Sequence, residues 1–244
     1  MTGPAFPAFQ HQGGEKKQTA LLWADTLDII SSIKDNLKHM TQSNTGRPGF
    51  DRRMSKDEIN TCPIKRWTGP VSVIRSSDEL AAAIRKLGGH TLLGFDTETR
   101  PAYKKGQSYR PALLQLACDN EVFIFQLKQL GLARPLREIL ADAAIIKAGV
   151  GLDYDIRELK KLSPFKAAGF MDLGHLARQA GIKNHGLRGL AAVLLGMRIA
   201  KGAQTSNWAR DVLTQKQIQY AATDAWVGRR LYLALEQVVG RQAV

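Results

Sequence analysis

Cysteine is nearly absent from this 244-residue sequence, which contains Cys62 and Cys118 and no other. There is no CxxC motif or Cys/His cluster, so we expect neither a disulfide-stabilised secreted domain nor a structural zinc site. Apolar runs long enough to span a membrane are also missing, and the N-terminus lacks the basic and apolar regions of a signal peptide. These absences favour a soluble, intracellular protein with two free thiols and no membrane association.

The motifs of several common enzyme classes are missing as well. The sequence has no G-x-x-x-x-G-K-[ST] phosphate loop and no G-x-S-x-G nucleophile elbow. Gly149 and Gly151 lack the third glycine of a dinucleotide-binding fingerprint. P-loop, serine-hydrolase and dinucleotide-dependent chemistry therefore have no support.

Basic residues, by contrast, are in excess, and the formal net charge is +13. Residues 1–70 contain 10 Lys and Arg against 7 Asp and Glu, and residues 71–244 contain 25 against 15. Because most of the excess lies outside the N-terminal part, the body of the protein should attract polyanions such as nucleic acid. A generally solvated surface explains the same charge equally well.

The chain divides into an extension, a lead-in segment and one domain. Residues 1–53 form the extension, in which 1–20 have a disordered composition, 21–40 have helical spacing and 41–53 resemble a polar, flexible linker. Met54 could equally be a translation start. Residues 54–69 lead into a domain that covers 70–240.

Within this domain, strands alternate with helices. Expected strands cover 71–74, 91–97, 112–117, 122–125 and 144–150. Expected helices cover 77–87, 135–141, 153–162, 172–180, 187–195 and 215–239. Three hairpin-linked strands followed by strand–helix alternation predict an α/β fold, with a mixed sheet of three antiparallel strands plus parallel strands, flanked by helices.

Three short segments carry acidic residues that could be catalytic. In the first, Asp96 and Glu98 end an apolar strand and point to the same face, where a divalent cation would relieve their repulsion. In the second, Asp153 and Asp155 begin a helix after a buried strand, a position where acids are also common as helix caps. Either of these two could be the functional residue.

The third segment places Tyr220 and Asp224 on one face of a late helix, because residues i and i+4 are neighbours there. Ala221, Ala222 and Ala225 are small enough to let this helix approach the sheet closely. Taken alone, the segment is more typical of a core helix with a half-buried tyrosine.

Together, in this order, the three segments resemble motifs of the DEDD superfamily of 3′–5′ exonucleases. The resemblance covers about residues 70–240, is closest to the ribonuclease D and Werner-syndrome exonuclease branch, and rests on FDTET, KAGVGLDYDIREL and SNWARDVLTQKQIQYAATDAW. It implies a ribonuclease-H-like fold. It favours Asp155 as the middle ligand, four residues before Leu159, and it implies the tyrosine subfamily, because Gln219 stands where another subfamily has histidine.

The resemblance also implies the cofactor, the partner and the roles. The partner would be nucleic acid with a free 3′ end, and the products nucleoside 5′-monophosphates. All the expected ligands are oxygen donors, which suit two Mg²⁺ or Mn²⁺ ions. Asp96 would bridge both ions, Glu98 and Asp224 would hold the ion that activates water, and Asp155 would support the other. Tyr220 would orient the attacking water.

Substrate contacts are expected next to these acids. The loop after the catalytic strand contains the basic residues Arg100, Lys104, Lys105 and Arg110. These could guide phosphates, and Tyr103 or Tyr109 could stack on a base, although a solvated hairpin loop would have the same composition. Thr97, between the two acids, is another expected contact. Trp208 could contact substrate or pack a helical segment against the core.

Two other classes of function remain as alternatives. A nucleic-acid-binding module could keep this fold without turnover, but it would typically have lost a carboxylate, and all four are present. An interaction protein could recruit partners through residues 21–40, which truncation from Met54 would test.

Overall fold

The computed structural model describes residues 48–240 of the chain. The disorder expected at 1–20 and the helix expected at 21–40 lie outside these residues. None of the helices in the described range is both long enough and apolar enough to cross a membrane.

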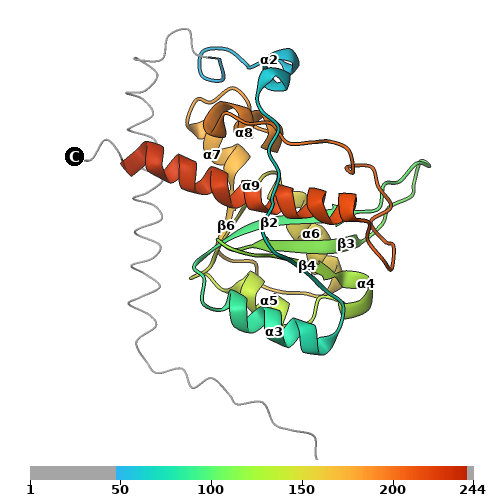
Figure 1. Cartoon of the computed structure of the whole chain (residues 1–244). Helices are drawn as coiled ribbons and strands as arrows, with labels where there is room; N and C mark the ends of the chain where they lie inside the picture. The colour runs from blue at the N-terminus through green and yellow to red at the C-terminus, as the bar shows by residue number, and fades with distance from the viewer. Residues whose placement is uncertain (1–47, 241–244) are drawn as a thin grey trace, which may run out of the picture.

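One six-stranded sheet forms the centre of the molecule (Figure 1). Its strands are β1 (Val71–Ile74), β2 (Leu92–Thr99), β3 (Pro111–Ala117), β4 (Val122–Gln126), β5 (Ile146–Gly149) and β6 (Phe170–Asp172). Their order across the sheet is β1-β4-β3-β2-β5-β6. The β2–β3 and β3–β4 pairs are antiparallel, while β1 runs parallel to β4 and β5 runs parallel to both β2 and β6. The predicted mixed sheet is therefore confirmed.

Helices cover both faces of this sheet. They are α2 (Lys56–Thr61), α3 (Ser77–Leu87), α4 (Leu127–Leu130), α5 (Arg134–Ala141), α6 (Leu152–Leu162), α7 (Leu173–Gln179), α8 (Leu187–Leu195) and α9 (Gln215–Gly240). Apolar side chains of α3, α5 and α6 pack with one face of the sheet. Those of α7, α8 and α9 pack with the other, and Figure 1 shows α9 crossing above the strands.

The long helix α9 lies unusually close to β2 and β5. A Cβ atom added to Gly94 in β2 would lie 1.9 Å from the carbonyl oxygen of Ala225, and one added to Gly228 in α9 would lie 2.6 Å from that of Ala148. Ala221, Ala222 and Ala225 are completely buried on the same side of α9. Small residues on both elements therefore bring α9 against the strand that contains Asp96.

Three short elements were not predicted. Helix α2 begins with a capping box in which Ser55 and Glu58 satisfy each other's backbone N–H groups, a sequence signal for a helix start. Helix α4 has four residues and β6 has three, which is too short for a periodic pattern to appear. β6 is only half-buried.

The prediction of a flexible linker at 41–53 is wrong for its last residues. Phe50 is 4% exposed and belongs to the apolar core formed with α7, α8 and α9. The backbone N–H of Lys183 donates to the carbonyl of Gly49 at 2.7 Å. Sequence composition identified the polar residues of this stretch but not the single aromatic side chain that fixes it to the domain.

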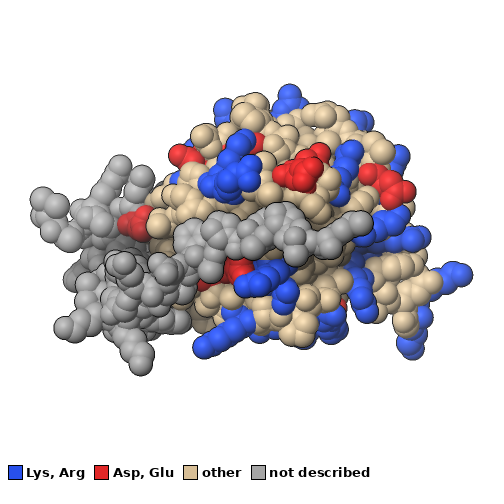
Figure 2. Space-filling view, turned by 90° about the horizontal axis from the view of Figure 1, so that it is seen from below, with Lys and Arg blue, Asp and Glu red and all other residues tan. Residues whose placement is uncertain are grey.

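Lys and Arg side chains are spread over the surface rather than collected at one terminus. In the view from below they are scattered over the visible face and gather toward the end from which the β2–β3 loop projects in Figure 1 (Figure 2). Acidic side chains lie among them in smaller number. This distribution suits a protein whose body binds a polyanion.

Candidate active site

Strand β2 places Asp96 and Glu98 on the face of the sheet that α9 covers. Both side chains are partly buried. One carboxylate oxygen from each, together with one from Asp224 of α9, lie within 4.8 Å of one another. The structure thus brings together three of the four predicted acidic ligands, from segments more than 120 residues apart in sequence.

Helix α9 holds Asp224 and Tyr220 one turn apart. Asp224 is 7% exposed, and its Oδ1 atom is buried without a hydrogen-bond partner. The Tyr220 hydroxyl lies near enough to the Asp224 carboxylate for each group to shift the pKa of the other. The Tyr220 ring also packs against the Trp208 ring, with 5.8 Å between centroids and 42° between planes. The ring contact with Trp208 therefore holds Tyr220 beside the acids.

The fourth acid comes from the start of α6, and its position separates Asp155 from Asp153. The hydroxyl of Thr97 donates to Asp155 Oδ1 at 2.7 Å, whereas Asp153 is exposed. The start of α6 is held by Asp172, whose Oδ2 accepts the backbone N–H groups of Gly151 and Leu152, both at 2.9 Å. Sequence reasoning missed this role of Asp172, which acts across 20 residues of chain.

Burial raises the pKa values of all four acids, and repulsion from the other acids adds to the rise at Asp96 and Glu98. Burial is the main cause for Asp96, whose pKa lies well above its ordinary value, with Asp224 and Asp155 adding repulsion. Burial and then Asp96 raise the pKa of Glu98 to about 10. The pKa of Asp224 rises to about 7 through burial, opposed by the interaction with the Tyr220 hydroxyl and by the charge of Arg188. Burial raises the pKa of Asp155 to about 6, opposed by its bond to Thr97.

Such a site does not hold four negative charges without compensation. The available ligand atoms are carboxylate oxygens alone, which are the donors preferred by hard divalent cations. Repelling oxygens within 4.8 Å of one another and the buried, unpartnered Oδ1 of Asp224 fit this kind of ion. The arrangement can therefore hold divalent metal and present it to an anionic substrate.

Comparison with known proteins identifies the family. A family model described as "3'-5' exonuclease" matches residues 71–240, which is most of the chain. The chain belongs to this 3′–5′ exonuclease family. The resemblance to the DEDD superfamily is thereby confirmed, and the acids described above lie inside the matched range.

Individual relatives support the same assignment. The chain is 26% identical over 230 residues to a 3′–5′ exonuclease of Arabidopsis thaliana, covering 88% of this chain and 79% of that one. It is 31% identical over 156 residues to the bifunctional 3′–5′ exonuclease/ATP-dependent helicase WRN of Mus musculus, covering 62% of this chain but 11% of that one. Among solved structures, the Aedes aegypti Nibbler EXO domain superposes with a TM-score of 0.66 at 22% identity, covering 74% and 94% of the two chains, and shows the shared fold.

Gln115 is a neighbour of the exonuclease site that sequence reasoning missed. It lies directly opposite Asp96 in the antiparallel β2–β3 pair, so the two side chains share a face. Gln115 is 0% exposed, and neither its Oε1 nor its Nε2 atom has a hydrogen-bond partner among the described residues. A buried, unsatisfied amide beside the ligand set is costly in free energy unless the assembled site supplies a partner. Its only sequence signal is a polar residue in an otherwise apolar strand.

The expected basic contacts all lie on the loop between β2 and β3. Its exposed cations are Arg100, Lys104, Lys105 and Arg110. The loop is braced at Tyr103, which is 80% exposed and whose hydroxyl donates to the Thr205 carbonyl at 3.2 Å. Arg100 lies over the ring of Tyr109 at 4.8 Å. These cations remain accessible to a polyanion.

The other two expected substrate contacts are buried. Trp208 is 0% exposed and packs against Tyr220, so the structure favours its packing role over a direct substrate contact. Thr97 is also buried, and its hydroxyl is occupied by Asp155. Both residues support groups of the exonuclease site from behind.

A second group of potential metal ligands lies where the β3–β4 turn meets the end of the α3–β2 connection. Ligand atoms of His90, Cys118 and Asp119 lie within 4.8 Å of one another. The Cys118 thiol, however, is already engaged with Asn120 Oδ1 at 3.2 Å and the Glu121 carbonyl at 3.1 Å. Both cysteines are free, as predicted.

Proposed function

We propose that this protein is a metal-dependent 3′–5′ exonuclease that removes nucleoside 5′-monophosphates from the 3′ end of DNA, RNA or both, using two Mg²⁺ or Mn²⁺ ions. The observation that carries the proposal is the convergence of Asp96, Glu98 and Asp224 within 4.8 Å, in a chain of the 3′–5′ exonuclease family. Asp155 completes the ligand set from the start of α6. Four carboxylates match the charge of two divalent ions.

Divalent ions held by these acids would acidify water and stabilise negative charge on the reacting phosphate. The chain itself supplies the positions of the groups. The charges of Asp224 in α9 and Asp155 in α6 both act on Asp96, which supports a role for Asp96 between these two ligands. Thr97 fixes Asp155 through its 2.7 Å hydrogen bond.

Tyr220 is proposed to orient the attacking water. Burial and the neighbouring carboxylates raise the pKa of its hydroxyl, so the group stays protonated at neutral pH and acts as a hydrogen-bond donor rather than a base. Trp208 holds the ring in place. A positioned donor of this kind contributes to rate through orientation, while the affinity for substrate comes from elsewhere.

The β2–β3 loop is proposed to contact the substrate strand. Its exposed cations can neutralise backbone phosphates, and the exposed ring of Tyr103 can stack on a base. None of these contacts reads base identity, so the proposal is for a free 3′ end with little sequence preference.

The test is a gel assay of purified protein on three 5′-labelled substrates: single-stranded DNA, duplex DNA with a recessed 3′ end, and RNA. Each is incubated with Mg²⁺, with Mn²⁺ or with excess chelator. We expect stepwise shortening of at least one substrate with metal and none with chelator. Cleavage of a closed circular strand that has no ends would overturn the exonuclease proposal.

A further inference from the structure

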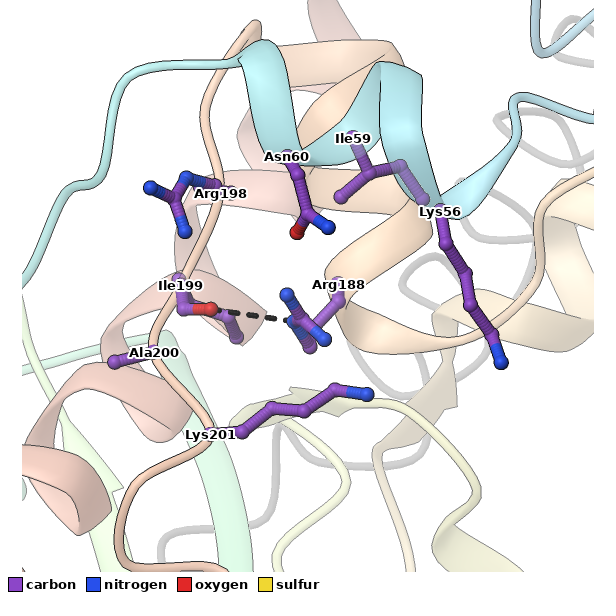
Figure 3. Close-up of a pocket in the computed structure, with 8 residues that line it drawn as sticks. All are labelled: Lys56, Ile59, Asn60, Arg188, Arg198, Ile199, Ala200 and Lys201. Atoms are coloured by element: carbon purple, nitrogen blue, oxygen red, sulfur yellow. Dashed lines mark hydrogen bonds between the residues drawn. The ribbon is translucent and has the colours of Figure 1, made fainter.

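A strongly basic pocket lies apart from the metal ligands, between α2, the first turn of α8 and the strand-like segment that follows α8. Its volume is about 320 Å³. It is lined by Lys56, Ile59, Asn60, Arg188, Arg198, Ile199, Ala200 and Lys201 (Figure 3). A cavity of this size is at the lower end of the range for small-ligand sites and accommodates a phosphate with part of its sugar.

The pocket carries four positive charges and no negative one. No carboxylate lines it, and among residues 48–236 no ion pair joins Lys56, Arg188, Arg198 or Lys201 to an acid. Four like charges around one cavity repel one another, and the repulsion is relieved when an anion enters. A solvated surface would normally intersperse acids among these cations.

Both arginines are held in a fixed orientation by the backbone. Arg188 Nε donates to the Ile199 carbonyl at 3.2 Å, the dashed contact in Figure 3, and Arg198 Nε donates to the Cys62 carbonyl at 3.0 Å. Their terminal guanidinium nitrogens make no hydrogen bond within the described part of the chain. A guanidinium fixed at Nε with its outer N–H groups available is suited to bidentate binding of phosphate.

The lead-in segment forms one wall of the pocket and is tied firmly to the domain. The Lys65 N–H donates to the Arg198 carbonyl at 2.9 Å, and the Arg198 N–H donates to the Pro63 carbonyl at 3.0 Å. Before α2, the backbone N–H and carbonyl of Met54 bond to the side-chain amide of Asn184 at 2.8 and 3.0 Å. Lys56 is therefore a built part of the pocket rather than a cation on a loose tail.

The packing of α8 along α9 connects the pocket to the exonuclease site. Arg188 belongs to α8, which packs along α9, and its positive charge partly opposes the rise in the pKa of Asp224. A nucleic-acid strand with its 3′ end at Asp224 therefore has the pocket within reach. Each further backbone phosphate brings one more negative charge to be neutralised.

We propose that this basic pocket binds a backbone phosphate of the nucleic-acid substrate away from the bond that is cleaved, which makes residues 54–65 of the lead-in segment part of the substrate-binding surface. The proposal rests on the proposed function, because it takes the substrate to be a polynucleotide. The phosphate can come from the strand being degraded or from a complementary strand, and the chemistry of recognition is the same.

The test uses two exposed lysines whose side chains have no hydrogen bond or ion pair in the described part of the chain. The full-length variant Lys56→Ala/Lys201→Ala removes two charges from the pocket and leaves both arginines in place. The matched control, Lys160→Ala/Lys166→Ala, removes two exposed lysines from α6 and the loop after it, on the opposite face of the sheet. Melting curves check that both variants fold.

Binding is measured by fluorescence anisotropy in Ca²⁺, across several salt concentrations. The probes are single strands of 2, 6 and 12 nucleotides and a duplex with a recessed 3′ end. We expect the pocket variant to bind the 12-mer or the duplex about five- to tenfold more weakly than the control variant does. On a single strand, the slope of the logarithm of the binding constant against the logarithm of the salt concentration should become shallower by about 0.7 for each lost phosphate contact. The loss should grow with strand length.

The probes show which strand supplies the phosphate. The experiment also separates failure of the pocket proposal from failure of the proposed exonuclease function. A loss on single strands assigns the phosphate to the degraded strand, and a loss confined to the duplex assigns it to the complement. The proposed phosphate site is overturned if the pocket variant loses the same affinity at all strand lengths, or if it binds every probe as well as the control variant does. Absence of turnover in the wild type, with the binding difference intact, would instead contradict the proposed exonuclease function.

Discussion

Thr97 and Asp155 are joined by a 2.7 Å hydrogen bond between the Thr97 hydroxyl and Asp155 Oδ1, which connects β2 to the start of α6. Thr97 lies between Asp96 and Glu98 in sequence but points to the opposite face of the strand. Three consecutive residues of β2 therefore supply two ligands on one face and orient a third ligand from the other face. This contact also determines which acid of α6 faces the site.

The choice between the two acids of α6 is the first prediction. Asp155→Asn should reduce kcat by at least about a hundredfold, because it removes a charged ligand from the metal site. Asp153→Asn should keep most activity, since Asp153 is exposed. Steady-state kinetics of the two variants, with melting curves as a control for folding, checks this. The reverse pattern would show that α6 uses its other acid.

Stability without metal should depend on pH in a direction opposite to that of a typical salt-bridged protein. Burial raises the pKa of Asp155 to about 6 and that of Asp224 to about 7, so the folded state binds protons that the unfolded state releases near pH 4. The stability contributed by these protons is present at low pH and is lost as pH rises from about 4 through 7.

Thermal unfolding in excess chelator at pH 5 and at pH 8 measures this effect. We expect the Mg²⁺-induced rise in Tm to be larger at pH 8, where the carboxylates are charged and repel one another without metal. Replacing Asp224 with Asn should reduce the difference between the two pH values. An Mg²⁺ effect that is equal at both pH values would contradict the coupling between burial and metal binding.

Tyr220 is predicted to contribute to turnover and not to substrate affinity. Tyr220→Phe removes one hydroxyl and keeps the ring contact with Trp208. Loss of a positioning group typically costs roughly 10²–10⁴-fold in rate, so kcat should fall by at least about tenfold while KM stays within a few-fold. Kinetics on a short 3′-ended substrate decides the matter. A silent variant with unchanged Tm would mean that Tyr220 only packs.

The contact between β2 and α9 is predicted to be sensitive to a single added methyl group. Gly94→Ala would place Cβ 1.9 Å from the Ala225 carbonyl oxygen, so α9 must move and take Asp224 with it. We expect a loss of about 1–3 kcal/mol in unfolding free energy and a fall in kcat. Gly89→Ala is the matched control, since its nearest atom would be 3.9 Å away. Equal behaviour of the two variants in denaturant titrations would be the contrary result.

Sequence patterns determined the long elements well and the tertiary contacts poorly. Helix α8 at 187–195 and strand β1 at 71–74 have the predicted bounds, because periodicity and flanking turn residues are local signals. Asp96, Glu98 and Asp224 could be named from motifs. The roles of Gln115, Asp172 and Arg188 could not, since each acts on a residue 19 to 36 positions away in sequence, and only the sheet register and the packing of α8 bring them together.

The most direct test of the central claim compares the same oligonucleotide labelled at its 5′ end and at its 3′ end. With Mg²⁺, we expect the 3′ label to appear at once as a mononucleotide while the 5′ label moves down a ladder one nucleotide at a time. Nearly all of this turnover should be lost in each of three variants whose melting curves show that they are folded: Asp96→Asn, Glu98→Gln and Asp224→Asn. A mononucleotide released first from the 5′ end, or a ladder that persists in excess chelator, would contradict the central claim.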